Sequence, residues 1–494
     1  MGSKLELDTQ HDEIERDRLK VGVSSGFRWN CYPAVSTSAQ VILDFLTVLI
    51  GNAVAYGLYL ELDVGKHHVD PSFYGQVNVL TSLGAVLVFS CMGVYRETAG
   101  LVNIEETRRL IRAVFYTSFA VFVGSFFVRE YSFSRITASL AVPVNLSLLY
   151  VQRWATSSVH GALHREGVGV RRCLIYGVGE IGISIAKRFF QNPQLGWLPV
   201  GFLDRDSSQI GESYRVTPGL AGRQIKVLGQ WEDLAAVVRN HRVTDIVMAV
   251  AADEIEQIVG HVTLLCQRLG VHCHFIHADT HRLWPTYELR NLDGLPLFSP
   301  RENRFSPYDL LKLVFDFVVS CILLILVFPL WLLIAMLIKY DSPGPLLFLQ
   351  KRIGLDEREF TIYKFRTMHV HTPPYAVTPS SNGDSRITRV GKFLRRTSLD
   401  ELPQLLNVLK GDMSLVGPRP EMPFIVATYN EYQRQRLAVK PGITGLWQIS
   451  GDRAFQIHEN IEYDLYYIAN RSLSLDLAIL FQTVFSVARG VGAC

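Results

Sequence analysis

Two adjacent acids, Asp400 and Glu401, lie in the segment RRTSLDELPQLLNVLKGDMSLVGPRPE, residues 395–421. Arg395 and Arg396 precede them, and a short apolar run follows. A carboxylate can attack a phosphoryl group and form an acyl phosphate, which divides one transfer into two steps. A neighbouring carboxylate can help to hold Mg²⁺ over the phosphates, where the metal neutralises developing charge. The residue types therefore predict a phosphoryl-transfer site, with Asp400 as nucleophile and both acids near the metal.

The same segment also has the pattern of an ordinary helix start. Ser398 and Glu401 have the spacing of a capping box, and apolar residues follow at helical spacing: Leu402, Leu405, Leu406 and Leu409. Pro403 has no N–H to donate, so it fits the first turn of a helix but not its fifth position. We therefore expect the helix to begin at Asp400 rather than at Ser398. Both acids would then lie at the positive end of this helix, where a phosphate can dock.

Cations are concentrated around the two acids. Residues 339–400 contain eleven Lys or Arg against six acids, an excess that suits phosphates or anionic headgroups. A solvated basic face is the alternative. Several of these and later cations lie on alternating or stiff segments, namely YKFRTM (363–368), GPRP (417–420) and KPGITG (440–445). The candidate phosphate-binding cations are Lys364, Arg366, Arg395, Arg396 and Arg419.

An α/β domain is expected over residues 165–295. A β-branched run is followed by Gly177, Gly179 and Gly182 with the spacing of a dinucleotide-binding turn, and Asp204 ends the next strand as a ribose-binding acid would. Further strands are expected at 200–204, 226–230, 244–250 and 272–277, with helical stretches such as 252–269 between them. This alternation predicts a Rossmann-like fold with a parallel sheet. Whether the domain binds NAD or another nucleotide stays open, because such turns occur without a ligand.

The first third of the chain is strongly apolar, and hydrophobic residues make up 48% of all 494 residues. A membrane span needs about 20 mostly apolar residues, and four segments approach this length: 38–60, 76–95, 112–128 and 136–152. Arginines and lysines flank the first and last segments on the outside of the group, which places both ends in the cytoplasm by the positive-inside rule. We expect a cytoplasmic tail over 1–37 and a four-helix transmembrane bundle over 38–155. A soluble four-helix bundle is the alternative.

A fifth apolar segment, residues 313–338, contains one charged residue, Asp316. It is long enough to span a membrane. Pro329 lies near its middle, where it removes a backbone donor and crowds the carbonyl of Ile325. A helix broken there could enter and leave the membrane by the same face. The residues alone leave both topologies open.

Four blocks of the last third resemble, in order and spacing, the catalytic domain of polyprenol-phosphate hexose-1-phosphate transferases, the monotopic phosphoglycosyl transferase superfamily. The blocks are DSPGPLLFLQKRIG (341–354), YKFRTM (363–368), the segment 385–421 and KPGITGLWQISG (440–451). The resembling domain covers residues 305–494. The preceding bundle and α/β domain resemble the long-form members, which initiate capsule, exopolysaccharide or O-antigen synthesis.

The resemblance implies a reaction and roles for individual residues. A UDP-sugar would give its sugar-1-phosphate to undecaprenyl phosphate and release UMP. Asp400 takes the place of the nucleophile, Glu401 that of the Mg²⁺-supporting acid and Arg395 that of a phosphate ligand. Arg419 and Lys364 would hold the donor phosphates. Glucose or galactose is the expected sugar, with glucose ahead.

The resemblance also places residues on the uridine or sugar side of the substrate, namely Lys440, Thr444 and Arg453. Many members have Arg directly after the Ser-Gly pair, whereas here Asp452 intervenes. This insertion could alter contacts with the base or the sugar.

A topology follows as well, because the superfamily's membrane helix enters and leaves on the cytoplasmic face at a proline that corresponds to Pro329. Phe328 stands where the family usually has Ser, which changes the hydrogen bonding at the break. UDP-sugars are cytoplasmic, so 313–338 is expected to be re-entrant, with both termini and the active site on the cytoplasmic side of a bacterial inner membrane. The expected fold is thus a mixed membrane protein whose catalytic domain is mainly helical. The expected partners are the UDP-sugar, undecaprenyl phosphate, the bilayer, a second copy in a homodimer and downstream glycosyltransferases.

Two other functions are compatible with parts of the sequence. A membrane-anchored NAD-dependent enzyme that modifies nucleotide sugars would use the glycine turn, and Tyr308 and Lys312 have the Tyr-x-x-x-Lys spacing of such enzymes. They lie outside the α/β domain, so we interpret them as a chance match. A non-enzymatic scaffold for polysaccharide assembly is the other alternative. A net charge of only +3 gives no indication of nucleic-acid binding.

Overall fold

The computed structural model describes residues 32–62, 71–95, 104–127, 135–216, 224–250, 262, 265–277, 287–292, 295–300, 307–372, 384–450 and 461–488. It divides into two compact units. One unit contains residues 1–99 and 113–283, and the other contains residues 100–112 and 284–494. The bundle and the α/β domain thus form the first unit, and the candidate catalytic residues lie in the second.

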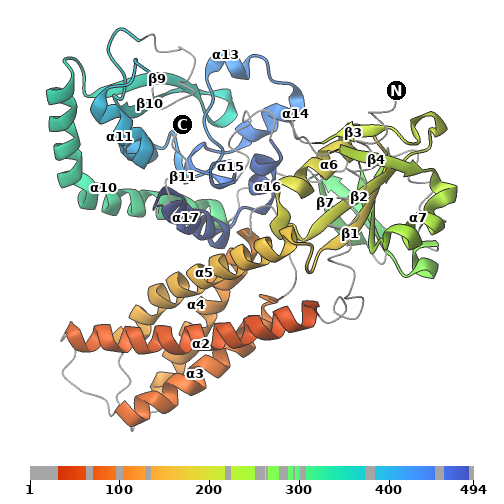
Figure 1. Ribbon diagram of the computed structural model, residues 1–494. Coiled ribbons are helices and arrows are strands. Elements are labelled where there is room, and N and C mark those ends of the chain that lie inside the picture. The colour runs from red at the N-terminus through yellow and green to blue at the C-terminus, as the bar shows by residue number, and fades with distance from the viewer. Residues whose placement is uncertain are drawn as a thin grey trace. The chain divides into compact units, whose positions relative to one another are not determined.

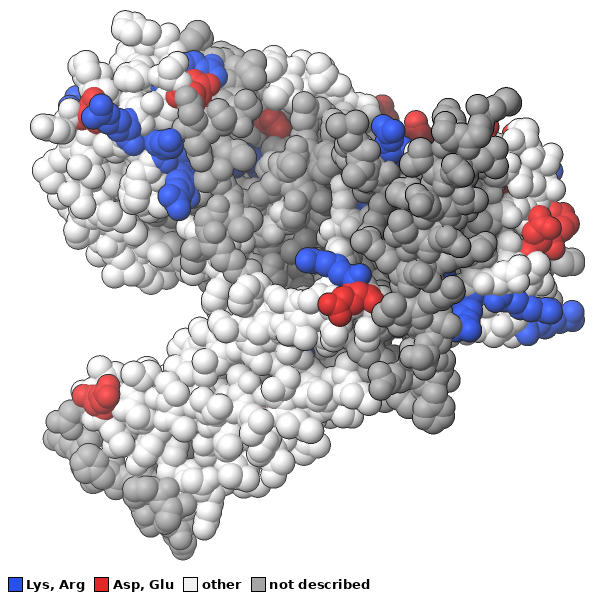
Figure 2. All heavy atoms as spheres, viewed as in Figure 1, with Lys and Arg blue, Asp and Glu red and all other residues white. Residues whose placement is uncertain are grey.

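The four apolar segments of the first third lie in helices, as predicted. Each helix begins before its apolar stretch, but the second and third helices end inside theirs, at Cys91 and Phe127. The helices are α2 (Tyr32–Glu61), α3 (Pro71–Cys91), α4 (Ile104–Phe127) and α5 (Arg135–Arg165) (Figure 1). In the part of the chain that the structure describes, three helices are long and apolar enough to cross a membrane: α2, α3 and the later α10 (Pro307–Asp341). Figure 2 shows the surface of α2 to α5 almost free of charged side chains on the face in view. These features fit a membrane-associated protein.

Helices α2 and α5 pack closely through small and polar residues. A Cβ atom on Gly51 would lie 2.0 Å from Oδ1 of Asn145, and the amide of Asn145 donates to Asn52 at 2.8 Å. Arg153 pairs with the fully buried Asp44 at 2.6 Å. Glycine lets the backbones of α2 and α5 come close together. The polar side chains between these helices pair with each other, which avoids the cost of burying unsatisfied hydrogen-bonding groups.

The α/β domain has a six-stranded sheet in the order β3-β4-β2-β1-β5-β6. All neighbours pair in parallel except β3 and β4, which confirms the predicted Rossmann-like architecture. Helix α6 (Glu180–Gln191) follows β1, and α7 (Leu234–His241) follows β4. The predicted helical stretch 252–269 lies largely outside the described residues. The strands are β1 (Arg171–Tyr176), β2 (Trp197–Leu203), β3 (Ser213–Arg215), β4 (Gln224–Gly229), β5 (Asp245–Val250) and β6 (His272–His277).

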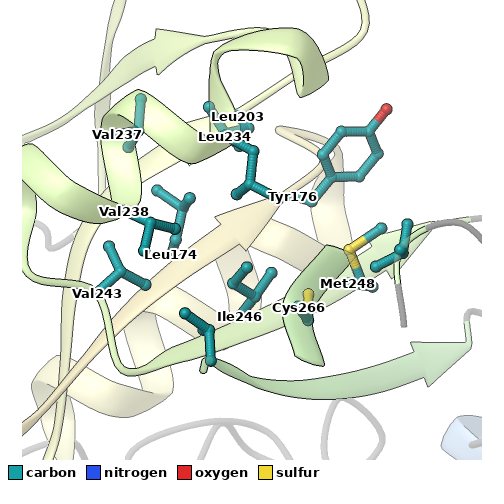
Figure 3. Close-up of a cluster of buried hydrophobic side chains, with 12 residues drawn as sticks. Leu174, Tyr176, Leu203, Leu234, Val237, Val238, Val243, Ile246, Met248 and Cys266 are labelled. Carbon is teal, nitrogen blue, oxygen red and sulfur yellow. The ribbon is translucent and has the colours of Figure 1, made fainter. Parts of the chain in front are cut away.

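The core of this domain fills both faces of the sheet because successive strand residues point to opposite sides. On one face, Leu174 and Tyr176 of β1 pack with Leu234 and Val238 of α7 (Figure 3). On the other face, the buried Ile175 belongs to a cluster that includes residues of α6. A β-branched or leucine-rich strand that is buried on both faces is typical of parallel sheets.

The second unit, which contains the candidate catalytic residues and is called the catalytic unit below, is mainly helical over the described part of 305–494, as predicted, and also contains small two-stranded sheets. Strands β9 and β10 form an antiparallel pair, β11 and β12 a parallel pair, and β7 and β8 an antiparallel pair. The strands are β7 (Tyr287–Leu292), β8 (Leu295–Pro300), β9 (Leu347–Ile353), β10 (Glu359–Phe365), β11 (Ser414–Val416) and β12 (Gly442–Thr444). The helices after α10 are α11 (Arg389–Thr397), α12 (Leu405–Lys410), α13 (Pro423–Val426), α14 (Glu431–Arg434), α15 (Leu446–Ile449), α16 (Glu462–Asn470) and α17 (Leu473–Ala488).

Helix α10 has two arms that meet at a bend (Figure 1), and Pro329 lies inside the helix. In the first arm, Asp316 accepts a hydrogen bond from Ser414 at 2.6 Å. At the end of the second arm, Asp341 accepts the N–H of Val390, at the start of α11, at 2.9 Å. Both arms therefore contact the same catalytic unit.

The first turns of α4 also belong to the catalytic unit, which the sequence did not indicate. The side chain of Gln482 in α17 donates to Thr107 at 2.9 Å, and Arg108 donates to Ser474 at 3.2 Å. Residues 104–112 are therefore a structural part of this unit, although they lie almost 200 positions before α10 in the chain.

Candidate active site

An ion pair joins two segments of the candidate site. Nζ of Lys364, in β10, lies 2.6 Å from Oε1 of Glu401, in the 3₁₀ helix η6 (Leu399–Gln404). Nη1 of Arg419 lies 3.7 Å from the same oxygen. Asp400 is the chain neighbour of Glu401 and is half-buried. The structure thus brings four of the predicted site residues together.

The turn that presents the acids differs from the expected helix start. Ser398 has a left-handed backbone with a φ of 56°, and its side chain makes no capping hydrogen bond. Ser398 is thus not the cap of a capping box, as Pro403 led us to expect, and the Glu401 carboxylate accepts a hydrogen bond from Lys364. The predicted start of an α-helix at Asp400 is wrong: α11 ends before Ser398, and the 3₁₀ helix η6 follows directly. Pro403 cannot donate to the preceding turn, and α12 begins only after it, at Leu405.

The two acids have opposite pKa shifts. Burial, together with the negative charge of Glu401, outweighs the lowering effects of Lys364 and Arg395 and raises the pKa of Asp400 to about 6. Burial also opposes ionisation of Glu401, but Lys364 and Arg419 outweigh it and lower the pKa of Glu401 to about 2. Neighbouring carboxylates with separated pKa values divide their roles. Glu401 is a fixed anion between cations, and Asp400 is the acid that can gain or lose a proton near neutral pH.

Asn407 holds the two segments in register. Its fully buried amide accepts the backbone N–H of Tyr363 at 3.0 Å and donates to the carbonyl of Thr361 at 2.7 Å. It therefore occupies a free edge of β10, next to Lys364, from the helix that follows Glu401. The sequence analysis missed this residue. The available signal was a polar side chain within the apolar run LLNVL.

Arg352, in β9, supports the site from a third segment. Its guanidinium donates to the carbonyl of Pro420 at 3.1 Å and to Oε1 of Gln350 at 2.7 Å. Its charge also contributes to the low pKa of Glu401. The antiparallel β9–β10 pair thus brings one cation to Glu401 and another to the turn that carries Arg419.

Comparison with known proteins identifies this arrangement. Residues 307–490 match the model of the bacterial sugar transferase family, and residues 90–276 match a CoA-binding domain. The chain is 32% identical over 484 residues to the UDP-glucose:undecaprenyl-phosphate glucose-1-phosphate transferase of Klebsiella pneumoniae, which covers 93% of this chain and 97% of that protein. The chain belongs to the bacterial sugar transferase family.

Other relatives carry related names. A UDP-glucose:undecaprenyl-phosphate glucose-1-phosphate transferase of Xanthomonas campestris pv. campestris is 29% identical over 92% of this chain and 94% of its own. An undecaprenyl-phosphate galactose phosphotransferase of Salmonella typhimurium is 30% identical over 67% of this chain and 71% of its own. The similarity therefore extends through the amino-terminal unit and is not confined to the catalytic one.

Two predicted substrate-binding residues of this bacterial sugar transferase are buried and contact other parts of the chain. Arg366 is 5% exposed, and its guanidinium donates to the carbonyls of Pro343 at 2.8 Å and Ser342 at 2.7 Å, just after α10. Thr444 is 6% exposed and shares a hydrogen bond with Thr483 of α17 at 2.7 Å. These contacts favour roles in holding the sugar transferase fold, because the donors are turned away from solvent.

The remaining predicted cations lie in different settings. Arg395 and Arg396 occupy the last turn of α11. The positive charge of Arg395 partly opposes the rise in the pKa of Asp400 that burial causes. Lys440 is half-buried, and its carbonyl would lie 2.5 Å from a Cβ on Gly417, so β12 runs close against the Arg419 turn. Arg453 lies outside the described residues.

The glycine motif of the α/β domain builds a tight turn. Gly177 has a φ of +99°, and a Cβ on Gly182 would lie 1.9 Å from the Gly177 carbonyl. Gly179 precedes α6 as its N-cap residue. Asp204 uses one carboxylate oxygen to accept the N–H of Val178 at 2.9 Å and the other to accept the N–H of Asp206 at 3.0 Å. The turn itself therefore needs glycine at positions 177 and 182.

Few protein ligands are available for a metal in the sugar transferase site. Among the described residues no three His, Cys, Asp or Glu side chains form a metal-binding group, and Glu401 is held by Lys364. Mg²⁺ is commonly bound by one or two carboxylates together with substrate phosphates. Asp400 fits such a site as the main protein ligand, with Glu401 in support.

Replacement of Asn407 by Ala should loosen β10. The N–H of Tyr363 and the carbonyl of Thr361 lose their partners, and an unpaired buried group costs about 1–3 kcal/mol. We expect faster amide hydrogen exchange in peptide 359–365, measured by mass spectrometry. Asn430→Ala, which removes a cap from α14, should leave that peptide unchanged. Unaltered exchange in the Asn407 variant would show that the amide does not hold the strand.

Proposed function

We propose that this bacterial sugar transferase moves a hexose-1-phosphate from a UDP-sugar to undecaprenyl phosphate and releases UMP. UDP-glucose is the donor that we expect first, and UDP-galactose is the second candidate. The main support for the proposal is the difference between the two adjacent acids. Glu401 is paired with cations and has a low pKa, whereas the pKa of Asp400 is raised to about 6. The names of the relatives supply the substrates. The chemistry of the site is consistent with a ligand that carries two phosphates.

The reaction would proceed in two displacements at one phosphorus atom. A carboxylate oxygen of Asp400 attacks the β-phosphorus of the UDP-sugar, the bond to the bridging oxygen breaks, and UMP leaves with that oxygen and its electron pair. A phosphate oxygen of undecaprenyl phosphate then attacks the same phosphorus. The acyl-phosphate bond breaks, the diphosphate product forms, and the Asp400 carboxylate is restored.

The cations around Glu401 would stabilise the charge that develops on the phosphates. Lys364 and Arg419 contribute two positive charges against one negative charge on Glu401, so one net positive charge remains for the substrate. Arg395 adds a further cation near Asp400. Groups held in place before reaction stabilise a transition state without reorganisation. Mg²⁺, held by Asp400 with support from Glu401 and by the substrate, would supply additional charge neutralisation.

The product would be a membrane lipid that carries a sugar diphosphate, so the enzyme would act at the first membrane step of a bacterial polysaccharide. Exopolysaccharide, capsule and O-antigen synthesis are all compatible with it, and a relative from Rhizobium leguminosarum is named exopolysaccharide production protein PSS. A glycosyltransferase would use the product next. We keep a homodimer and a nucleotide in the α/β domain outside the mechanism, since no step requires either.

We further propose that α10 is re-entrant on the cytoplasmic face of the inner membrane. Its support is that Lys312 and Asp316 of the first arm and Asp341 of the second all contact the catalytic unit. A bend at a proline allows both arms to lie on one side.

Replacement of Asp400 by Asn tests the nucleophile. An amide cannot form the acyl phosphate, so UMP release from UDP-glucose with undecaprenyl phosphate in membranes should fall roughly a thousandfold or more. Asp412→Asn changes a nearby acid outside the site and should retain activity. In the wild type without acceptor, one equivalent of UMP and a phosphohexose on the peptide containing Asp400 are expected. Full turnover by Asp400→Asn would exclude the covalent mechanism.

The activity should depend on pH through Asp400. The attacking form is the carboxylate, and its pKa of about 6 means that this form is lost as pH falls through 6. We expect kcat/KM to decline about tenfold per pH unit below that value and to level off above about pH 7. The pKa of Glu401 is lowered. The stabilisation that its negative charge provides is therefore fully present when the pH is above the ordinary pKa of a glutamate, and it is lost only as the pH falls toward about 2.

In Glu401→Gln the charge that raises the pKa of Asp400 is removed. The acidic limb of the residual activity should therefore move to lower pH, whereas the exposed control Glu359→Gln should keep the wild-type profile. A wild-type profile that is flat between about pH 5 and 7 would contradict the assignment of Asp400 as an attacking carboxylate.

The topology can be tested with cysteines at the two ends of α10. Leu310 and Tyr340 are both exposed, so Leu310→Cys and Tyr340→Cys should react with an impermeant maleimide in inside-out vesicles and stay unlabelled in spheroplasts. The parent protein gives the background from native cysteines. Labelling of the two variants from opposite sides would establish a spanning helix.

A further inference from the structure

The turn Gly417–Glu421 carries Arg419 into the site but cannot hold its own shape. Pro418 and Pro420 have no N–H, so this segment offers few backbone donors. Buried carbonyl groups nevertheless need hydrogen-bond partners. The donors must therefore come from other segments.

Four consecutive carbonyls of the turn are satisfied in this way, two by backbone N–H groups and two by arginines. The pairs are Gly442 N–H to Pro418 at 2.9 Å, Arg436 to Arg419 at 2.8 Å, Arg352 to Pro420 at 3.1 Å and Ile353 N–H to Glu421 at 3.0 Å. The backbone on both sides of the Arg419 side chain is thus held at every residue.

Arg436 is the donor to Arg419 itself, and it is the most deeply buried of these cations at 2% exposure. Its Nη2 atom also pairs with Asp464 of α16 at 2.8 Å. Its Nη1 atom donates to the hydroxyl of Tyr429 at 2.7 Å and lies 3.8 Å from Glu421. Two acids and a hydroxyl therefore hold the guanidinium in one orientation, and its Nη2 atom also donates to the Arg419 carbonyl.

Unlike the buried Arg436, Arg419 has a partly exposed side chain. This side chain is 35% exposed, and its Nη1 atom lies 3.7 Å from Oε1 of Glu401. We propose that Arg436 is a positioning residue for the transferase reaction: it fixes the main chain of Arg419 so that the Arg419 guanidinium faces Glu401 and the substrate phosphates. This inference rests on the proposed function for its activity readout. A planar guanidinium suits the task because it can bond the carbonyl, the hydroxyl and a carboxylate at once, which an ammonium group cannot do with the same geometry.

A purely structural arginine would have different consequences. Its loss would lower stability and would reduce activity by the same factor whether or not Arg419 is present. A positioning residue acts through Arg419, so its effect should disappear when the Arg419 side chain is removed. A double-mutant cycle separates these two cases.

The cycle uses Arg436→Lys, Arg419→Ala and the double variant in the full-length protein in membranes, with UMP release as the assay. Arg436→Lys keeps the buried charge, and we expect a fall in kcat/KM of about tenfold or more, carried mainly by kcat. In the Arg419→Ala background the same change should alter kcat/KM less than about twofold. Arg434→Lys is the matched control, because Arg434 lies two residues away on the surface and pairs with Glu357. Equal effects of Arg436→Lys in both backgrounds would overturn the proposal.

Two further measurements keep the test decisive. If Arg436→Lys does not fold, Tyr429→Phe removes one anchor of the guanidinium and should give a smaller loss that again depends on Arg419. Independently of any reaction, the exchange of the amide hydrogens in peptide 417–425 should be faster in Arg436→Lys than in Arg434→Lys. Unchanged exchange would overturn the proposal even if wild-type turnover is high. Accelerated exchange without UMP release by the wild type would refute the proposed function and leave the clamp on the turn established.

Discussion

The ion pair between Lys364 and Glu401 is the interaction on which the candidate site depends. Two adjacent carboxylates in a partly buried turn would repel each other, and one of them would take up a proton. Lys364, at 2.6 Å, instead holds Glu401 as an anion, and Arg419 adds a second cation at 3.7 Å. Asp400 then titrates separately, near neutral pH. The same pair ties β10 to η6, so the electrostatics of the acids and the packing of the unit cannot be altered independently.

A second constraint is the shortage of backbone donors at the site, which its prolines create. Pro403 interrupts the helical turn after the acids, and Pro418 and Pro420 remove two N–H groups beside Arg419. The unit compensates with buried polar side chains that reach backbone groups of other segments, notably Asn407 on β10 and Arg436 on the Arg419 turn. Each brace comes from a segment remote in sequence, so the reactive side chains are held by the whole unit rather than by their own loops.

Much of this could be predicted from the sequence where the signal is local. The α/β strands follow from β-branched runs between glycine turns, and the acid pair with its neighbouring cations follows from residue types. The α-helix start predicted at Asp400 was wrong, because the conformation of this turn depends on contacts between segments far apart in the sequence. The buried contacts of Arg366 with Ser342 and of Thr444 with Thr483 join distant segments in the same way. Lys364 and Glu401 are 37 positions apart. A glutamate that closes a capping box and a glutamate that pairs with a lysine far away in the sequence can have the same neighbouring residues. Sequence spacing alone therefore could not distinguish the two cases.

Helix α10 is likewise held by contacts with segments that are remote in the sequence. A straight helix of 35 residues would be about 50 Å long, well beyond the roughly 30 Å of a bilayer core. Its apolar side chains are largely exposed between the ends, while Lys312 and Asp316 at one end and Asp341 at the other contact the catalytic unit. Asp476 of α17 pairs with Lys312 at 3.0 Å, and the Tyr467 hydroxyl lies 2.8 Å from Asp476 and 3.0 Å from the carbonyl of Val416, so its one proton serves these two acceptors. Val416 directly precedes the Arg419 turn. Helix α10, which is long and apolar enough to cross a membrane, is therefore linked through Asp476 and Tyr467 to the strand that leads directly into the Arg419 turn.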